Sequence, residues 1–216
     1  MEAKIFAVYK PKGLTSNDVL NKLRRFYGTK KVGHAGTLDP LAKGVLVVAV
    51  GREATKKLGE LVKKEKEYLA TVRLGIKSTT DDAEGEKTVQ QVRHKPMSSE
   101  VKKVLKKFEG EIFQIPPIFS AVKIQGKEAY KYARKGQEVT LKPRKVEVKK
   151  IVVLKYHWPY LKLKVITGSG VYIRSLARDL GEKLKIGGYL FNLERTRVGD
   201  FIKAKSKKLS YFTKPK

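Results

Sequence analysis

A single carboxylate stands inside a glycine-bracketed turn near the start of this 216-residue chain. The turn runs from Gly33 to Leu41 and places Asp39 directly before a proline. An ionised aspartate held in a loop can attack a carbon atom or remove a proton, so the pattern indicates a nucleophile or a general base. The structural alternative is an aspartate that accepts hydrogen bonds from its own turn, which is common before proline.

The charge balance indicates which substrates such a carboxylate would meet. The chain has 49 Lys and Arg residues against 21 Asp and Glu, a formal net charge of +28. That imbalance favours polyanionic partners, so Asp39 is a candidate nucleophile acting on nucleic acid. Membrane surfaces are anionic too, but the sequence has no run of 18 apolar residues and no signal-peptide layout in its first 20 residues. We therefore expect a cytoplasmic protein with no membrane partner.

The sequence also limits metal chemistry. There is no cysteine, which excludes disulfides and thiolate zinc sites. The three histidines are far apart in the sequence, so a histidine-based metal site is not expected.

The glycines around Asp39 partly match two nucleic-acid or phosphate-binding motifs, the P-loop and the GXXG loop of KH modules, and neither match is complete. The stretch from Gly28 to Gly33 begins like a P-loop, but His34 and Ala35 stand where the closing Gly-Lys-Ser/Thr should be. Gly33 to Gly36 has the GXXG spacing of a KH module, which would lie between helices rather than before a strand.

Two further residues could take part in chemistry. Arg174 lies in the first turn of a predicted helix, where the helix dipole disfavours a cation. A nearby anion, either Asp39 or a phosphate, would stabilise it there; the alternative is a solvated surface arginine. Tyr68 lies on the apolar face of a predicted strand, where it is either a core tyrosine or a ring that stacks on a flat base.

One residue and two short segments each allow two interpretations. His34 could insert into a nucleic-acid stack or cap its turn. The turn from Lys10 to Gly13 could contact phosphate or be a plain basic turn. The stretch from Pro116 to Lys123 could stiffen a pocket wall or merely cross the sheet.

Strands outnumber helices in the predicted pattern, and they do not alternate regularly with helices. We therefore expect an α+β protein with a mixed sheet. The predicted strands are Ile5–Tyr9, Gly44–Val50, Glu67–Leu74, Val146–Tyr156, Leu161–Thr167 and Leu190–Phe201. The first predicted helix follows a cap at Thr15 or Ser16 and ends at Gly28. Further helices are predicted over Glu53–Lys63, Ser98–Phe108 and Glu128–Arg134. Gly168 to Gly170 open a last helix, whose apolar stripe runs from Ile173 to Leu184.

Nine segments carry a distinctive pattern in a fixed order. They are Lys10–Ser16, Gly33–Ala42, Gly51–Lys56, Lys66–Tyr68, Thr80–Gly85, Pro116–Lys123, Tyr130–Gly136, Gly170–Arg174 and Leu193–Gly199. Together they resemble the TruB family of tRNA pseudouridine synthases over nearly the whole chain. The resemblance implies the pseudouridine synthase fold, a central mixed and largely antiparallel sheet flanked by helices and loops.

The same resemblance implies an activity: isomerisation of the T-loop uridine of tRNA, position 55, to pseudouridine. It implies that Asp39 is the catalytic aspartate and that Arg174 is its partner. Tyr68 is implied as the ring stacked on the target uracil and as a candidate base for the C5 proton.

Supporting roles are implied for residues that bind the substrate. Ile173 and Leu193 would wall the pocket, and Asp82 would bond the flipped base. His34 would fill the stack that the base leaves, and Lys10 would support the site through its Lys-Pro turn. Lys123 belongs to the same implied substrate-binding set.

The resemblance also sets expectations for domains and partners. Residues 1–202 are expected to form the catalytic domain and 203–216 a basic tail, without the small C-terminal PUA domain of typical members. The expected partner is the T-arm stem-loop of tRNA, bound by a monomer without guide RNA, metal or cofactor. The alternatives are a guide-dependent relative of the Cbf5/dyskerin kind and a non-catalytic RNA-binding or tRNA-folding protein.

Overall fold

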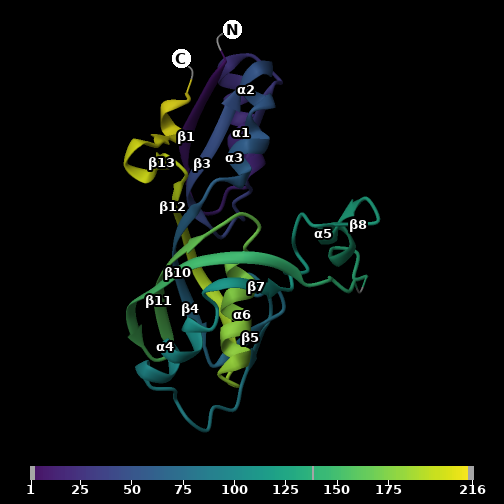
Figure 1. Cartoon of the computed structure of the whole chain (residues 1–216). Helices are drawn as coiled ribbons and strands as arrows, with labels where there is room; N and C mark the ends of the chain where they lie inside the picture. Colours follow the sequence, from purple (N-terminus) through teal and green to yellow (C-terminus); the bar gives the residue numbers. More distant parts are fainter. Residues whose placement is uncertain (1–2, 138, 214–216) are drawn as a thin grey trace. The chain divides into compact units, whose positions relative to one another are not determined.

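The computed structural model describes residues 3–137 and 139–213 of the chain. The chain divides into two compact units. The first comprises Met1–Leu69 and Leu193–Lys216, and the second comprises Ala70–Asn192. Two long strands, β4 (Lys66–Leu74) and β12 (Gly188–Val198), contribute residues to both units (Figure 1).

The first unit is a sheet with helices and carries the Asp39 turn. Its strands run in the order β14-β1-β3-β12, with β2 paired to β3 and β13 paired to β12. β3 pairs antiparallel with β1 and parallel with β12. Besides its parts of β4 and β12, its elements are β1 (Lys4–Lys10), α1 (Ser16–Tyr27), β2 (Val32–His34), β3 (Lys43–Val50), α2 (Arg52–Lys56), α3 (Leu58–Lys63), β13 (Phe201–Ile202) and β14 (Lys207–Lys208).

Helix α1 forms as predicted, from signals at both of its ends. Thr15 and Asp18 make a reciprocal capping box, and Gly28 closes the helix in the left-handed conformation with φ 63°. The helix buries Val19, Leu20 and Leu23. These local preferences agree with the burial pattern, which is why the sequence was sufficient to locate this helix.

Gly44 allows β3 to approach β12 closely. Its φ is +116°, and a Cβ added there would lie 2.2 Å from the carbonyl oxygen of Arg195 and 2.7 Å from its nitrogen. We expect Gly44→Ala to lower the free energy of unfolding by about 3 kcal/mol or more, since backbone strain and steric overlap add. Gly59→Ala is the matched control, because nothing lies within 4 Å of a Cβ at that exposed helical position. Urea unfolding checks both variants, and a Gly44→Ala protein as stable as Gly59→Ala would contradict the expectation.

The second unit is a sheet covered by helix α6. Its strands run in the order β12-β4-β11-β10-β7, and β11 and β7 pair antiparallel with β10. Besides its parts of β4 and β12, its elements are β5 (Ile76–Ser78), β6 (Lys87–Val89), α4 (Ser98–Lys106), β7 (Gly110–Gln114), β8 (Lys123–Ile124), β9 (Lys127–Glu128), α5 (Ala129–Ala133), β10 (Arg144–His157), β11 (Tyr160–Thr167) and α6 (Ile173–Lys183).

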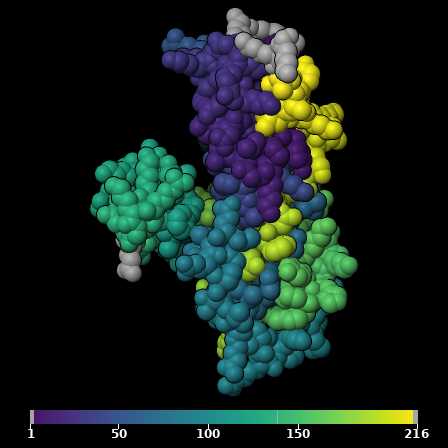
Figure 2. All heavy atoms as spheres, turned by 180° about the vertical axis from the view of Figure 1, so that it is seen from behind, coloured from purple at the N-terminus to yellow at the C-terminus, as the bar shows by residue number. Residues whose placement is uncertain are grey.

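The core of the second unit follows the predicted periodicities. In β4, Ala70, Val72 and Leu74 are buried on alternate positions, as expected of a strand with one core face. In α6, the buried stripe includes Leu176 and Leu180. The segment around α5 gathers into a small group of its own (Figure 2) with Val122, Ala129 and Leu141 at its centre.

Most predicted elements are confirmed, including the α+β class with a mixed sheet. Two boundaries are wrong. The expected helix over Glu53–Lys63 is two helices, because Lys57 closes α2 through an i→i−3 hydrogen bond to Ala54. The expected strand Leu190–Phe201 ends at Val198, because the chain turns at Gly199 and returns as β13.

The segment expected to be a basic tail has structure as far as residue 213. It contains the 3₁₀ turns η1 (Lys203–Lys205) and η2 (Leu209–Tyr211), and between them β14 pairs parallel with β1. Phe212 is 2% exposed, with its ring centre 5.7 Å from that of Phe6 and 5.5 Å from that of Phe26. Apolar packing therefore holds this segment on the first unit; residues 214–216 lie outside the described residues.

Across residues 3–137 and 139–213, none of the helices combines the length and apolar character needed to cross a membrane.

Candidate active site

The Asp39 turn joins β2 to β3 in the first unit and is held from several sides. The Ser16 hydroxyl donates to the Leu38 carbonyl at 3.0 Å and accepts from the Leu38 amide at 2.9 Å. The Gly13 amide donates to the Pro40 carbonyl at 2.8 Å. Asp39 itself is half-buried, and its carbonyl accepts from the Ala42 amide at 3.0 Å. The turn is therefore anchored on both sides of the carboxylate.

Two buried side chains, Tyr68 from β4 and Arg195 from β12, face this turn. Tyr68 is 6% exposed and Arg195 is 1% exposed. Burial lowers the pKa of the Arg195 guanidinium, while a side-chain hydrogen bond with Tyr68 and the charge of Asp39 act in the opposite direction. The structure thus brings a carboxylate, a phenol and a guanidinium into one cluster within the first unit.

Arg195 also holds the backbone of the turn. Its Nη2 donates to the Gly36 carbonyl at 2.9 Å and its Nη1 to the Thr37 carbonyl at 3.4 Å. Its Nε donates to the Val45 carbonyl of β3 at 2.8 Å. One guanidinium therefore joins the turn to the strand that follows it.

Lys66 brings a second buried cation close to the same turn. Its Nζ donates to the carbonyls of Val62 and Lys64, both at 2.7 Å. A Cβ on Gly36 would lie 3.5 Å from Arg195 Nη1 and 3.7 Å from Lys66 Cε, so both cations border that glycine. Burial and then the charge of Arg195 lower the pKa of Lys66 from 10.5 to about 8.

The lowered pKa of Lys66 makes stability depend on pH. Between pH 8 and 10.5 the unfolded chain holds this proton and the folded chain has released it, so the free energy of unfolding should rise with pH. From about pH 7.5 to about 9.5 we expect the wild type to gain roughly 2 kcal/mol relative to Lys66→Met. Urea unfolding of both proteins at intermediate pH values measures the difference, and parallel pH dependences would contradict it.

Lys10 and His34 lie in the first unit as well. Lys10 is fully buried, and its Nζ donates to the carbonyls of Pro11 at 3.0 Å and Leu14 at 2.6 Å, so it stabilises the Lys-Pro turn. Burial and the charge of Arg195 lower the pKa of His34, which favours its neutral form. The buried Nδ1 of His34 has no hydrogen-bond partner within the described part of the chain.

Arg174 and Asp82 form a second cluster, in the second unit. Arg174 is 5% exposed, with Nη1 3.6 Å from the Asp82 carboxylate and Nη2 donating to the Phe119 carbonyl at 2.8 Å. Asp82 also accepts from the Thr80 hydroxyl at 2.5 Å and the Glu84 amide at 3.0 Å. The solvated-surface interpretation of Arg174 is therefore excluded, and Asp82 is one anion beside it; the pairing with Asp39 stays a prediction.

The remaining predicted residues differ in exposure. Ile173 is the first residue of α6 and is 5% exposed, and Leu193 on β12 is 7% exposed, as expected of pocket walls. Lys123 is exposed on β8. Their contact with a substrate stays a prediction.

Sequence reasoning missed a role for Arg195, although a signal was present. Leu193 and Arg195 are two residues apart in β12, so they share one face of the strand. Because Leu193 was already expected to point into a pocket, the same alternation predicts an inward-facing arginine that needs acceptors or an anion.

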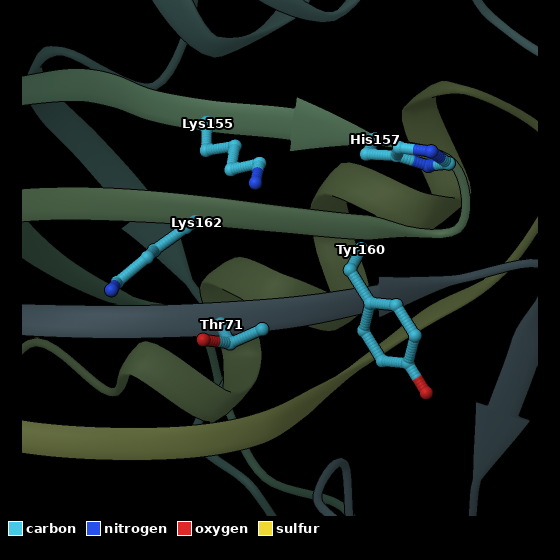
Figure 3. A pocket seen from close by; sticks show the side chains of 5 residues that line it. All are labelled: Thr71, Lys155, His157, Tyr160 and Lys162. Carbon is cyan, nitrogen blue, oxygen red and sulfur yellow. The ribbon is translucent and has the colours of Figure 1, made fainter.

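The second unit also has a shallow pocket of about 310 Å³. Figure 3 shows its lining: Lys155 and His157 from β10, Tyr160 and Lys162 from β11, and Thr71 from β4. Basic and aromatic side chains of this kind suit nucleic acid. None of the predicted site residues lines this pocket.

Within residues 3–137 and 139–213, no group of three or more His, Asp or Glu side chains is arranged to hold a metal ion. The cluster around Asp39 offers different chemistry. A neighbouring cation favours the ionised form of a carboxylate, and an ionised carboxylate can act as a nucleophile or a base.

Comparisons with known proteins show the family to which the chain belongs. A family model described as the N-terminal domain of TruB family pseudouridylate synthases matches residues 24–173. The tRNA pseudouridine synthase B of Cutibacterium acnes is 44% identical over 205 residues, covering 93% of this chain and 69% of the relative. That of Corynebacterium aurimucosum is 47% identical over 201 residues, covering 91% and 67%.

A solved structure shows the same fold. A chain in the crystal structure of a Cbf5–Nop10–Gar1 complex matches with a TM-score of 0.74 and 30% identity, covering 95% of this chain and 52% of that one. The chain thus spans about two thirds of the length of its curated relatives and about half of that structure. The family match covers most of the residues, and the chain belongs to the TruB family of pseudouridylate synthases.

Proposed function

We propose that this protein isomerises the T-loop uridine at position 55 of tRNA to pseudouridine, with Asp39 as the reacting carboxylate. The observation that carries the proposal is the cluster in which Arg195 bonds Tyr68 and the Asp39 turn and faces the charge of Asp39. The name of the curated relatives, tRNA pseudouridine synthase B, supports a tRNA substrate.

The reaction rearranges bonds within one nucleotide. The N1–C1′ glycosidic bond breaks, the uracil turns, and a C5–C1′ bond forms; C5 loses a proton and N1 gains one. Asp39 either attacks C1′ or removes the 2′ proton, and both routes require its ionised form. Product and substrate are isomers, so the balance requires no oxidant, phosphoryl donor or other co-reactant.

The target base must first leave its stack, at a cost of a few kcal/mol. Stacking of the uracil on Tyr68 and filling of the vacated space by His34 offset part of that cost in this proposal. A neutral His34 suits the second role, because an imidazole ring without charge enters a base stack with less desolvation.

The +28 formal charge supports binding of the RNA backbone. We propose residues 1–202 as the catalytic region, because Asp39, Tyr68 and Arg195 all lie within it, and a monomer as the active form. A tRNA substrate is consistent with a cytoplasmic protein.

Release of tritium from uracil C5 tests the proposal. The purified chain is incubated with a T-arm stem-loop that carries 5-³H-uridine at the target position, without guide RNA or added metal. The expected result is release that approaches one tritium per RNA, with none from a stem-loop labelled only at a stem uridine. No release from the target label would contradict the stand-alone activity.

The likeness to a chain of the Cbf5 complex favours one alternative, an enzyme directed by a guide RNA. The same assay distinguishes the two. Release that appears only when a guide RNA and partner proteins are added would replace the stand-alone proposal with this alternative.

A further inference from the structure

The Arg195 guanidinium makes several hydrogen bonds that together hold the Asp39 turn. Its guanidinium donates to the backbone carbonyls of Gly36, Thr37 and Val45, and it also bonds the Tyr68 side chain. Only arginine presents five N–H donors in a rigid planar fork. The acceptors lie on both sides of the turn, so their positions are coupled through this one group.

A charge in this position has a stability cost. Burying a guanidinium is expensive, and an apolar side chain of similar volume is often as stabilising or more so. Here the cost is increased by Lys66, a second cation that borders the same glycine. An arrangement that opposes stability in this way is expected where it serves a site.

We propose that Arg195 is a positioning residue for the reaction, which fixes the Asp39 carboxylate relative to Tyr68 and favours its ionised form. This inference rests on the proposed function. The fork holds the Gly36 and Thr37 carbonyls two and three residues before Asp39, and the same guanidinium bonds Tyr68. The relative placement of acid and ring is thereby set before the RNA binds.

The charged and titratable groups around this guanidinium come from one turn and two strands. Asp39 lies on the turn and Tyr68 on β4, and both favour the charged form of Arg195. Lys66 on β4 and His34 on β2 both experience its positive charge. Loss of the Arg195 charge removes a cation that faces Asp39, so protonation of Asp39 becomes easier.

Two substitutions of Arg195 distinguish the effect of its planar donor geometry from the effect of its charge. Arg195→Lys keeps the charge and loses the planar fork, and we expect kcat to fall by about 100-fold with KM and RNA affinity nearly unchanged. Arg195→Met loses both, and we expect the acid limb of its kcat/KM profile to move to higher pH, while that of Arg195→Lys stays in place.

Arg197 provides the matched control. It lies two residues further along β12, is half-buried and pairs with Glu65. Arg197→Lys should keep wild-type kcat. A folded Arg195→Lys protein with wild-type kcat would overturn the proposal, and circular dichroism and RNA binding establish that it is folded. If Arg195→Met does not fold, Arg195→Lys alone decides.

Asp39→Asn distinguishes this inference from the proposed function. If Asp39→Asn is inactive while Arg195→Lys turns over normally, only the role of Arg195 is overturned. If Asp39→Asn itself turns over normally, the proposed function has failed.

Discussion

Asp39→Asn is expected to lower the single-turnover rate by about 10⁴-fold or more, while the Kd for T-arm RNA stays within about 2-fold of wild type. Asparagine keeps the size of the side chain and one acceptor oxygen but loses the charge and the nucleophile. Tritium release from saturating labelled stem-loop gives the rate, and filter binding gives the Kd.

The control for this substitution is Asp200→Asn. Asp200 is exposed in the first unit, so the same chemical change there should leave both quantities unaltered. Turnover by Asp39→Asn within 10-fold of wild type would show that another group carries the reaction. A parallel loss of RNA affinity would show that Asp39 acts in binding instead.

The second large effect is on RNA affinity as a function of salt. With a formal charge of +28, the protein should release counterions from the RNA when it binds. If six phosphates are contacted, raising monovalent salt from about 50 to about 200 mM should weaken binding about 10³-fold. Isothermal binding curves across this range give the slope, and a Kd independent of salt would contradict an electrostatic interface.

The C-terminal segment allows that interface to be located. Lys205 at the end of η1 and Lys208 on β14 are both exposed, and the packing of Phe212 against its ring neighbours holds this segment in place. If both lysines contact phosphates, Lys205→Ala with Lys208→Ala should raise the Kd and reduce the salt slope by about 2. An unchanged slope would mean that this segment does not touch the RNA backbone.

Local signals were sufficient for the elements that frame the site. The Thr15–Asp18 capping box and Gly28 define α1 within a short stretch of sequence. The apolar run of β3 and the alternation in β4 are equally local. The predictions that were wrong concern features set by tertiary contacts. The strand ends at Val198, before Gly199, because β13 pairs back with β12, and the C-terminal segment is ordered because Phe212 packs against Phe6.

The residues of the candidate site also differ in whether the local sequence or a long-range contact places them. The resemblance picked out Asp39 and Tyr68, because residue patterns carry them, whereas sequence reasoning gave no role to Arg195, which lies in the same cluster. Its approach depends on the parallel register that pairs Arg195 with Gly44 across 150 residues of sequence. No local preference sets that register. The Asp82 carboxylate beside Arg174 is a similar case, since a loop brings it there.

The most direct test of the central claim is a crystal structure of the protein bound to T-arm RNA with 5-fluorouridine at the target position. The account predicts a base turned out of its stack against the Tyr68 ring, with the Asp39 carboxylate within about 3.5 Å of ribose C1′ or C2′. A target nucleotide still stacked in the RNA loop, or an Asp39 carboxylate out of reach of its ribose, would contradict the account.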